Sequence, residues 1–190
     1  MRAIPEENIP ESLWSDNCLK LPPCLERAYR HFINEYNLVA LTQPQKDKHS
    51  IGGESKEDTL EHFATRYGVS ACRLQGILLD PKNALSTIPD DLVNTFSDGR
   101  ISVLDIACGS GAASISILST INELRKNNII PQLPLQIDLT GGDFSPHALI
   151  IYEDIVLHLE KDFRSTGIEV SFSPKFLSFN RSRNHLRKVI

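Results

Sequence analysis

The apolar positions of this chain change their spacing near its middle. In the first half they recur at helical intervals, as in Leu25, Ala28, Phe32 and Tyr36. The helices predicted from this spacing span residues 24–41, 57–67, 70–79 and 91–96, and Gly68 is the predicted stop between the second and the third. The first half of the chain is therefore expected to be helical.

In the second half the apolar positions form short runs that are separated by turns. The predicted strands span residues 101–106, 135–139 and 168–173, and the predicted helices span 112–124 and a segment that opens at Ser145-Pro146. Ser145 supplies a capping hydroxyl, and Pro146 suits the first helical position. We expect an α/β fold in which a helical region precedes a parallel sheet of three strands with both faces covered.

Two stretches lack this periodicity. Residues 1–23 are rich in proline and acidic residues, which predicts an irregular arm with Trp14 as its anchor on an apolar surface. Residues 42–57 contain a double glycine and almost no apolar side chains, which indicates a solvated loop.

A glycine-rich turn follows the first predicted strand, in the sequence VLDIACGSGAA. Asp105 falls near the carboxyl end of that strand. Gly109 and Gly111 permit a tight turn that brings backbone N–H groups close to a ligand. The helix that begins at Ala112 carries partial positive charge at its N-terminus, so the arrangement is typical of a nucleotide-type site.

A second acid follows the next predicted strand. Asp143 comes directly after the segment LQIDLTGG. Because the carboxyl ends of parallel strands meet at one edge of a sheet, we expect Asp105 and Asp143 to lie at the same edge. An acid at the end of the second strand holds a ribose diol in dinucleotide-binding folds.

The segments VLDIACGSG and GGDFSPHAL resemble motifs I and II of the class I S-adenosylmethionine-dependent methyltransferases, which have a Rossmann-like fold. The resemblance implies that S-adenosylmethionine is the cofactor and that Asp143 accepts hydrogen bonds from its ribose hydroxyls. It also implies that the methionine end is surrounded by Asp105, Ala107, Gly109, Ser110 and Gly111. Phe144 is a further predicted cofactor-binding residue.

The chain departs from the motif pattern at two points. Ala107 replaces the first glycine of motif I, and residues 126–134 form a proline-bearing insertion between the motifs. One alternative is an α/β domain that uses tight glycine turns for structural reasons alone. Another is a nicotinamide-binding domain, which fits less well because Ser114 stands where the third glycine of GxGxxG is expected.

Composition sets further limits. The 190 residues are 41% apolar and 23% charged with a net charge of −4, which is ordinary for a globular protein and gives no support to wholesale nucleic-acid binding. Without a visible secretory signal or membrane-span run, we predict a cytoplasmic protein and no membrane partner. The four cysteines form no CxxC pair, which favours reduced thiols over a zinc site or a disulfide framework.

No catalytic residue is identified. His147 is explained as a polar residue at a helix start, Tyr152 as a core residue and Cys108 as a packing residue rather than a nucleophile. Asn180 is the one weak candidate for contact with the adenine after the third strand.

The resemblance divides the chain into three parts. Residues 1–96 are the arm and helical region, 97–180 a partial Rossmann-like domain that binds S-adenosylmethionine, and 181–190 a basic tail. The helical region either shapes the cofactor and substrate pocket or only buries the sheet. The tail is either solvated or a basic docking surface for nucleic acid or an acidic partner.

The family's fold continues beyond the third strand, whereas this sequence stops there. We expect the strand 101–106 to keep one unpaired edge, covered by the N-terminal half, by a second copy or by a different chain. The sequence is equally compatible with a truncated piece of a longer protein. The methyl acceptor stays open among nucleic acid, protein and small molecules.

Two functions from different classes follow. The first is an S-adenosylmethionine-dependent methyltransferase or its cofactor-binding half, which is an enzyme if the missing half is supplied. The alternative is a catalytically inactive, truncated methyltransferase-fold module that acts as a binding or scaffold subunit through its exposed sheet edge.

Overall fold

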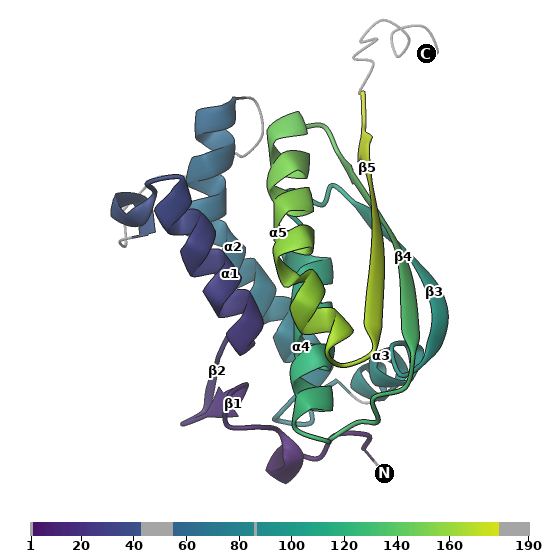
Figure 1. The fold of residues 1–190 in the computed structure, drawn as a ribbon. Helices are drawn as coiled ribbons and strands as arrows, with labels where there is room; N and C mark the ends of the chain where they lie inside the picture. Colours follow the sequence, from purple (N-terminus) through teal and green to yellow (C-terminus); the bar gives the residue numbers. More distant parts are fainter. Residues whose placement is uncertain (1, 43–54, 86, 179–190) are drawn as a thin grey trace, which may run out of the picture.

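The computed structural model describes residues 2–42, 55–85 and 87–178 (Figure 1). Its elements are η1 (Glu6–Asn8), β1 (Trp14–Ser15), β2 (Cys18–Leu19), α1 (Pro23–Glu35), η2 (Val39–Thr42), α2 (Lys56–Leu79), α3 (Ile88–Thr95), β3 (Gly99–Ile106), α4 (Ala112–Lys126), β4 (Leu135–Asp143), α5 (Pro146–Arg164) and β5 (Ile168–Phe176). The predicted fold class is confirmed: a helical region precedes a partial Rossmann-like sheet of three parallel strands with helices.

The sheet has the order β3-β4-β5, and both pairings are parallel. Connections between parallel strands are right-handed, so consecutive strands added in one direction put their crossover helices on the same face. Accordingly α4 and α5 both cover one face of the sheet (Figure 1). The carboxyl ends of all three strands point to the same edge.

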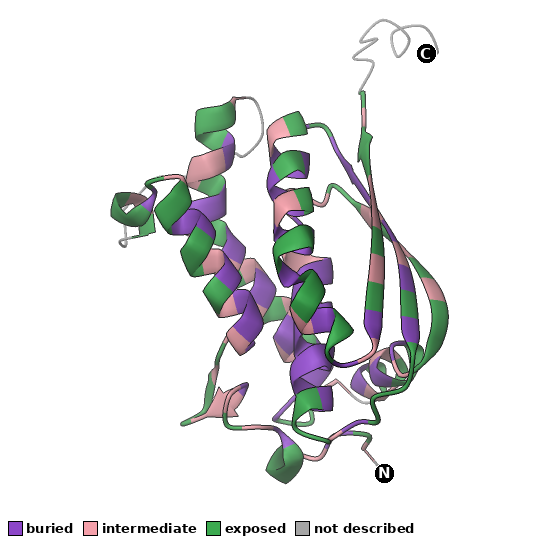
Figure 2. Cartoon of the chain, in the orientation of Figure 1, coloured by how far each residue is buried: buried purple, intermediate pink, exposed green. Residues whose placement is uncertain are grey.

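The expectation that both faces of the sheet are covered is wrong. Residues of β3 alternate strictly between half-buried and exposed, and Leu104 and Ile106 are 68% and 57% exposed on the outer face. The reason is topological, because a sheet of only three consecutive strands receives both crossover helices on its inner face. In Figure 2 strand β3 has no buried residue, whereas β4 alternates buried with less buried residues as far as Thr140.

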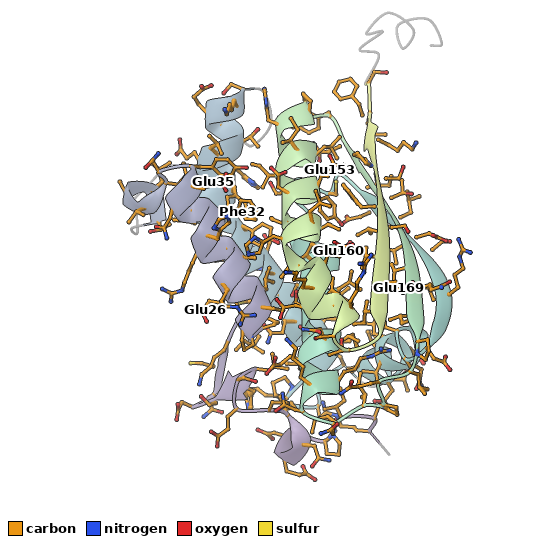
Figure 3. The ribbon with its side chains drawn as sticks, viewed as in Figure 1. Glu26, Phe32, Glu35, Glu153, Glu160 and Glu169 are labelled. Carbon is orange, nitrogen blue, oxygen red and sulfur yellow. The ribbon has the colours of Figure 1, made fainter. Side chains whose placement is uncertain are left out.

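The N-terminal helices form a further layer over α4 and α5. Helix α2 packs along α4, where the Ser116 hydroxyl donates to the Ala71 carbonyl over 2.6 Å. Helix α1 packs on α5, where Phe32 meets the ring of His158. Of the glutamates that Figure 3 labels on these two helices, Glu26 is half-buried and the others are exposed. One hydrophobic cluster runs from the arm through these helices to the inner face of the sheet.

Two helix predictions need correction. Helix α1 ends at Glu35 instead of residue 41, because Asn37 adopts a left-handed conformation (φ 56°). Residues 57–67 and 70–79 belong to the single helix α2, since Gly68 stays helical. Glycine inside a helix costs only about 1 kcal/mol, and the packing of α2 on α4 outweighs this cost.

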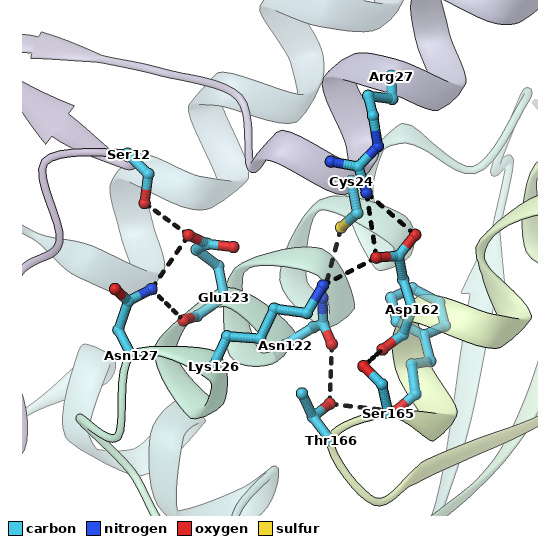
Figure 4. A network of polar contacts seen from close by, with 11 residues as sticks. Ser12, Cys24, Arg27, Asn122, Glu123, Lys126, Asn127, Asp162, Ser165 and Thr166 are labelled. Carbon is cyan, nitrogen blue, oxygen red and sulfur yellow. Dashed lines mark hydrogen bonds and ion pairs between the residues drawn. The ribbon is translucent and has the colours of Figure 1, made fainter.

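The second half of α4 is connected by polar contacts to the arm, to α1 and to the end of α5 (Figure 4). Glu123 accepts from Ser12 over 2.6 Å, and Lys126 pairs with Asp162 over 2.8 Å. The Asn122 amide donates to the Cys24 thiol, and its oxygen accepts from Thr166 over 2.8 Å. These contacts fix the helical region to the sheet half.

Several predicted features lie outside the described residues. They are most of the loop 42–57, the adenine candidate Asn180 and the basic tail 181–190. Within the described part of the chain, the helices are too short or too polar to cross a membrane.

Candidate functional site

The candidate site lies at the carboxyl edge of the sheet, between β3 and β4. Asp105 pairs in register with Gly141, and Asp143 is the last residue of β4. The loop after β3 reaches across to β4, where the Cys108 N–H donates to the Gly142 carbonyl over 3.2 Å. Both predicted acids therefore belong to the same edge of the sheet.

The loop between β3 and α4 depends on left-handed backbone conformations. Gly109 and Gly111 have φ values of 52° and 77°, and Ala107 has a φ of 56°. Only glycine adopts this region at no steric cost, so Ala107 is held in a strained conformation. The backbone conformation at position 107 is therefore one that glycine would adopt more easily than alanine does.

Asp143 holds this loop in place. Its side chain is 4% exposed, and one carboxylate oxygen accepts the Gly109 N–H over 2.8 Å while the other accepts the Ser145 N–H over 2.8 Å. Each carboxylate oxygen has a second lone pair, so the group retains acceptor capacity. The contacts join the glycine loop to the start of α5 through one buried anion.

A cavity of about 160 Å³ lies beside this carboxylate. It is lined by Thr59 and His62 of α2, by Ala107, Gly109 and Ser110 of the loop, and by Asp143, Phe144, Ser145 and Ala148 at the start of α5. Five of the seven predicted cofactor-binding residues line it: Ala107, Gly109, Ser110, Asp143 and Phe144. Phe144 is 43% exposed and offers an open aromatic surface at the rim.

The structure places the other two predicted residues, Asp105 and Gly111, outside the lining. The Ser114 hydroxyl donates to the Asp105 carboxylate over 2.5 Å, and the Tyr152 hydroxyl donates to the same oxygen over 3.4 Å. Asp105 therefore has its partners on the helix side of the sheet. Its contacts tie the N-terminus of α4 to α5 beneath the loop.

The two loop glycines have different surroundings. A Cβ atom added to Gly111 would lie 2.2 Å from the ring of Tyr152, so close packing requires glycine there. A Cβ atom added to Gly109 would meet nothing within 4 Å, although Gly109 lines the cavity. Gly109 thus leaves room beside its backbone, whereas Gly111 serves the packing of α5.

Thr59 and His62 are site residues that the sequence does not reveal. They come from the first two turns of α2, far from both motifs in the sequence. The expectation that the helical region shapes a pocket is the one prediction that points toward them. The Thr59 and Ser145 hydroxyls share a buried hydrogen bond of 3.1 Å. Burial lowers the pKa of His62, Arg66 lowers it further, and the Asp143 carboxylate acts in the opposite direction.

Cys108 has the character expected of a packing residue. Burial, assisted by the charges of Asp105 and Asp143, raises the pKa of its thiol to about 12. A thiol with this pKa stays protonated at neutral pH and is a poor nucleophile. All four cysteines are free, and the described residues contain no His, Cys, Asp or Glu cluster that could hold a metal ion.

The chain matches no protein-family model, and no curated protein is significantly similar to it. The site must therefore be interpreted from its own residues.

A larger cavity of about 620 Å³ lies beside α1 and η2, lined by Tyr29, Arg30 and Thr42 among others. It lies away from the strand ends and contains neither loop glycine nor buried carboxylate.

Proposed function

We propose that this chain is an S-adenosylmethionine-dependent methyltransferase or the cofactor-binding half of one. The main support is the buried Asp143 carboxylate, which lines the cavity beside a glycine loop whose Gly109 leaves open space. An acid at this strand end is suited to a ribose diol, and the adjacent loop precedes a helix N-terminus that attracts anionic groups.

The residues around the cavity fit the parts of such a cofactor. Asp143 has acceptor capacity left for ribose hydroxyls after binding Gly109 and Ser145. The exposed ring of Phe144 suits contact with the adenine, and Ser110 with the loop backbone suits the methionine end. At about 160 Å³ the cavity is smaller than the roughly 300–1,000 Å³ of pockets that enclose a drug-sized ligand. It therefore holds one moiety, with the rest of the molecule over the rim.

When bound, S-adenosylmethionine supplies an electrophilic methyl group for in-line displacement. The contribution of this chain is binding and orientation. Asp143 fixes the ribose, the loop fixes the methionine end, and the Thr59–Ser145 hydrogen bond holds α2 over the site. Positioning of this kind lowers the barrier of a bimolecular transfer.

Calorimetric titration with S-adenosylmethionine tests the proposal. We expect the wild-type chain to bind and Asp143→Asn to weaken the binding by roughly 5- to 150-fold, because a charged acceptor loses about 1–3 kcal/mol of hydrogen bonding. Asp138→Asn is the matched control, since Asp138 lies on the outer face of the same strand and pairs with Arg100 over 2.8 Å. Phe144→Ala is a second test at an exposed position.

The proposal fails if the wild-type chain does not bind the cofactor. It also fails if Asp138→Asn weakens binding as much as Asp143→Asn does. Circular dichroism on each variant separates a lost contact from a lost fold.

A second candidate is a binding or scaffold subunit, and one observation favours it. Among the strands that the structure describes, β3 has a hydrogen-bonded neighbour on one side only, and it exposes Leu104 and Ile106 on the outer face. Free strand edges of this kind pair with other strands. Light scattering should then give a mass above one chain that Leu104→Lys reduces, and a monomeric wild-type protein at high concentration would contradict a self-associating subunit.

A further inference from the structure

The cavity at the carboxyl edge of the sheet is lined by few titratable residues. Of its nine lining residues, only His62 and Asp143 are titratable. The groups contributed by the loop after β3 and by the first turn of α5 carry no charge. The net charge of the lining is therefore −1 when the His62 imidazole is neutral and zero when it is protonated.

The position of His62 is fixed by the fold. It lies one turn after Thr59 on α2, and Thr59 is buried and hydrogen-bonded to Ser145, which is the N-cap of α5. Thr59 and Ser145 are 4% and 1% exposed, so this contact is shielded from water. The imidazole is thus held at the rim on the α2 side, with the Asp143 carboxylate on the sheet side.

The charges that act on His62 come from two elements. Arg66, one turn further along α2, disfavours the imidazolium, and Asp143 at the end of β4 favours it. Burial disfavours it most, so the pKa of His62 lies below its ordinary value. The imidazole is therefore neutral at pH 7.5 and takes up a proton at lower pH than an unperturbed imidazole does.

We propose that His62 is a specificity-determining residue: its protonation removes the preference of the pocket, which the Asp143 carboxylate creates, for the sulfonium cofactor over the uncharged thioether product. The inference rests on the function proposed above. The two ligands share the adenosyl and amino acid parts and differ by one methyl group and one positive charge at sulfur. A lining of net charge −1 favours the cation, and a lining of net charge zero loses that preference.

Paired titrations test this inference. We expect the ratio of the Kd for S-adenosylmethionine to the Kd for S-adenosylhomocysteine to rise on going from pH 7.5 to pH 5.5 in the wild-type chain. The size should be of the order of 5-fold, as for one added charge beside a partly solvated pocket. In His62→Gln, which keeps a polar side chain but cannot become charged, the ratio should stay constant.

Arg66→Gln sharpens the test without touching the lining. Removing this cation makes protonation of His62 easier, so the change in the ratio should move to higher pH. The imidazole proton resonances of His62 report the same titration by NMR without any ligand, and their midpoint should fall in Asp143→Asn because the favourable carboxylate charge is lost.

The outcomes separate the two proposals. If both ligands bind but the ratio is independent of pH, or changes equally in wild type and His62→Gln, the role of His62 is refuted while cofactor binding stands. If neither ligand binds at either pH, the proposed function and the role of His62 fail together.

Discussion

The two ends of the three-stranded sheet are built in opposite ways. At the amino end the fully buried Arg125 guanidinium donates to the carbonyls of Ser97, Leu133 and Thr166 over 2.6, 2.6 and 2.8 Å. At the carboxyl end a loop with left-handed residues borders a cavity. One cation binds the carbonyls of the turns at the first end, whereas at the second end backbone and carboxylate groups lie beside a cavity.

The difference indicates that the contacts of Arg125 at the amino end stabilise the fold, whereas the carboxyl end is the candidate place for ligand binding. The three carbonyls that Arg125 contacts belong to the three turns that lead into β3, β4 and β5. Because these three carbonyls are satisfied internally, they are not free to bind a ligand, although a cavity of about 330 Å³ lies beside the starts of β4 and β5. In open α/β sheets ligands bind outside the carboxyl ends of the strands. Here that end places the buried Asp143 carboxylate and a glycine loop beside a cavity.

The largest expected effect on stability comes from removing the Arg125 guanidinium at the amino end of the sheet. Arg125→Met removes the donors of three carbonyl groups and should lower the free energy of unfolding by about 3–5 kcal/mol, since each orphaned buried acceptor costs about 1–3 kcal/mol. Urea denaturation measures the loss. Arg164→Met is the matched control, because this exposed arginine pairs with the exposed Glu160 one turn away, and its loss should cost less than about 0.5 kcal/mol. Similar losses in both variants would contradict the role of Arg125.

The next effect separates the two glycines of the loop. Gly111→Ala forces a Cβ atom into the Tyr152 ring at a left-handed position and should cost about 2–4 kcal/mol. Gly109→Ala meets no neighbouring atom and should cost only about 1 kcal/mol.

Gly109 is also expected to matter for cofactor affinity. Gly109→Ala should weaken S-adenosylmethionine binding while the fold persists, because it adds a methyl group to a residue that lines the cavity and meets no other atom of the chain there. If Gly109→Ala destabilised the chain as much as Gly111→Ala, the distinction between the two positions would be wrong.

The sequence predicted the sheet half well because its signals are local. Strand runs, the glycine turn and the Ser145-Pro146 helix start are all encoded within a few residues, and the observed elements match them. The helical half was predicted less well. The end of α1 depends on the conformation of Asn37, and the continuity of α2 through Gly68 depends on packing against α4.

The site was predicted in part for the same reason. Asp143, Gly109 and Ser110 belong to local motifs and line the cavity, but the partners of Asp105 and the contribution of α2 come from tertiary packing. No local pattern encodes that Thr59 meets Ser145 or that Tyr152 lies against Gly111. The uncovered outer face follows from strand order, which the residues of β3 alone do not specify.

A smaller, stabilising effect is expected at Ala107. Its φ of 56° is unfavourable for alanine and easily adopted by glycine, so Ala107→Gly should raise the free energy of unfolding by about 0.5–1 kcal/mol after the entropy cost of glycine. Thermal denaturation followed by circular dichroism measures it. A loss of stability in this variant would mean that the alanine side chain makes a contact worth more than the strain.

The smallest expected effect is a pH dependence of stability that arises at His158, away from both ends of the sheet. The ring of His158 stacks on His31 with centroids 4.7 Å apart. Burial, then the charges of His31 and Arg27, lower the pKa of His158 against the opposing effect of Asp162 and Glu35. The unfolded state therefore binds more protons below its ordinary pKa near 6.5, and stability should fall as the pH drops from 7.5 to 5.5.

His158→Gln should reduce this fall without altering the pH dependence of cofactor selectivity, which we assign to His62. Urea denaturation at the two pH values measures the first quantity, and paired ligand titration measures the second. A variant that lost the pH dependence of ligand selectivity as well would show that the two histidine sites are coupled.

The central claim is that ligand binding belongs to the carboxyl end of the sheet, and amide NMR spectra recorded during addition of S-adenosylmethionine test it most directly. We predict that the shifted resonances gather at Ala107–Ser110 and Asp143–Ser145, whereas those of Arg125 and the turns that it contacts stay in place. Shifts centred on the amino end or on the cavity beside α1, or no shifts at saturating cofactor, would contradict the account.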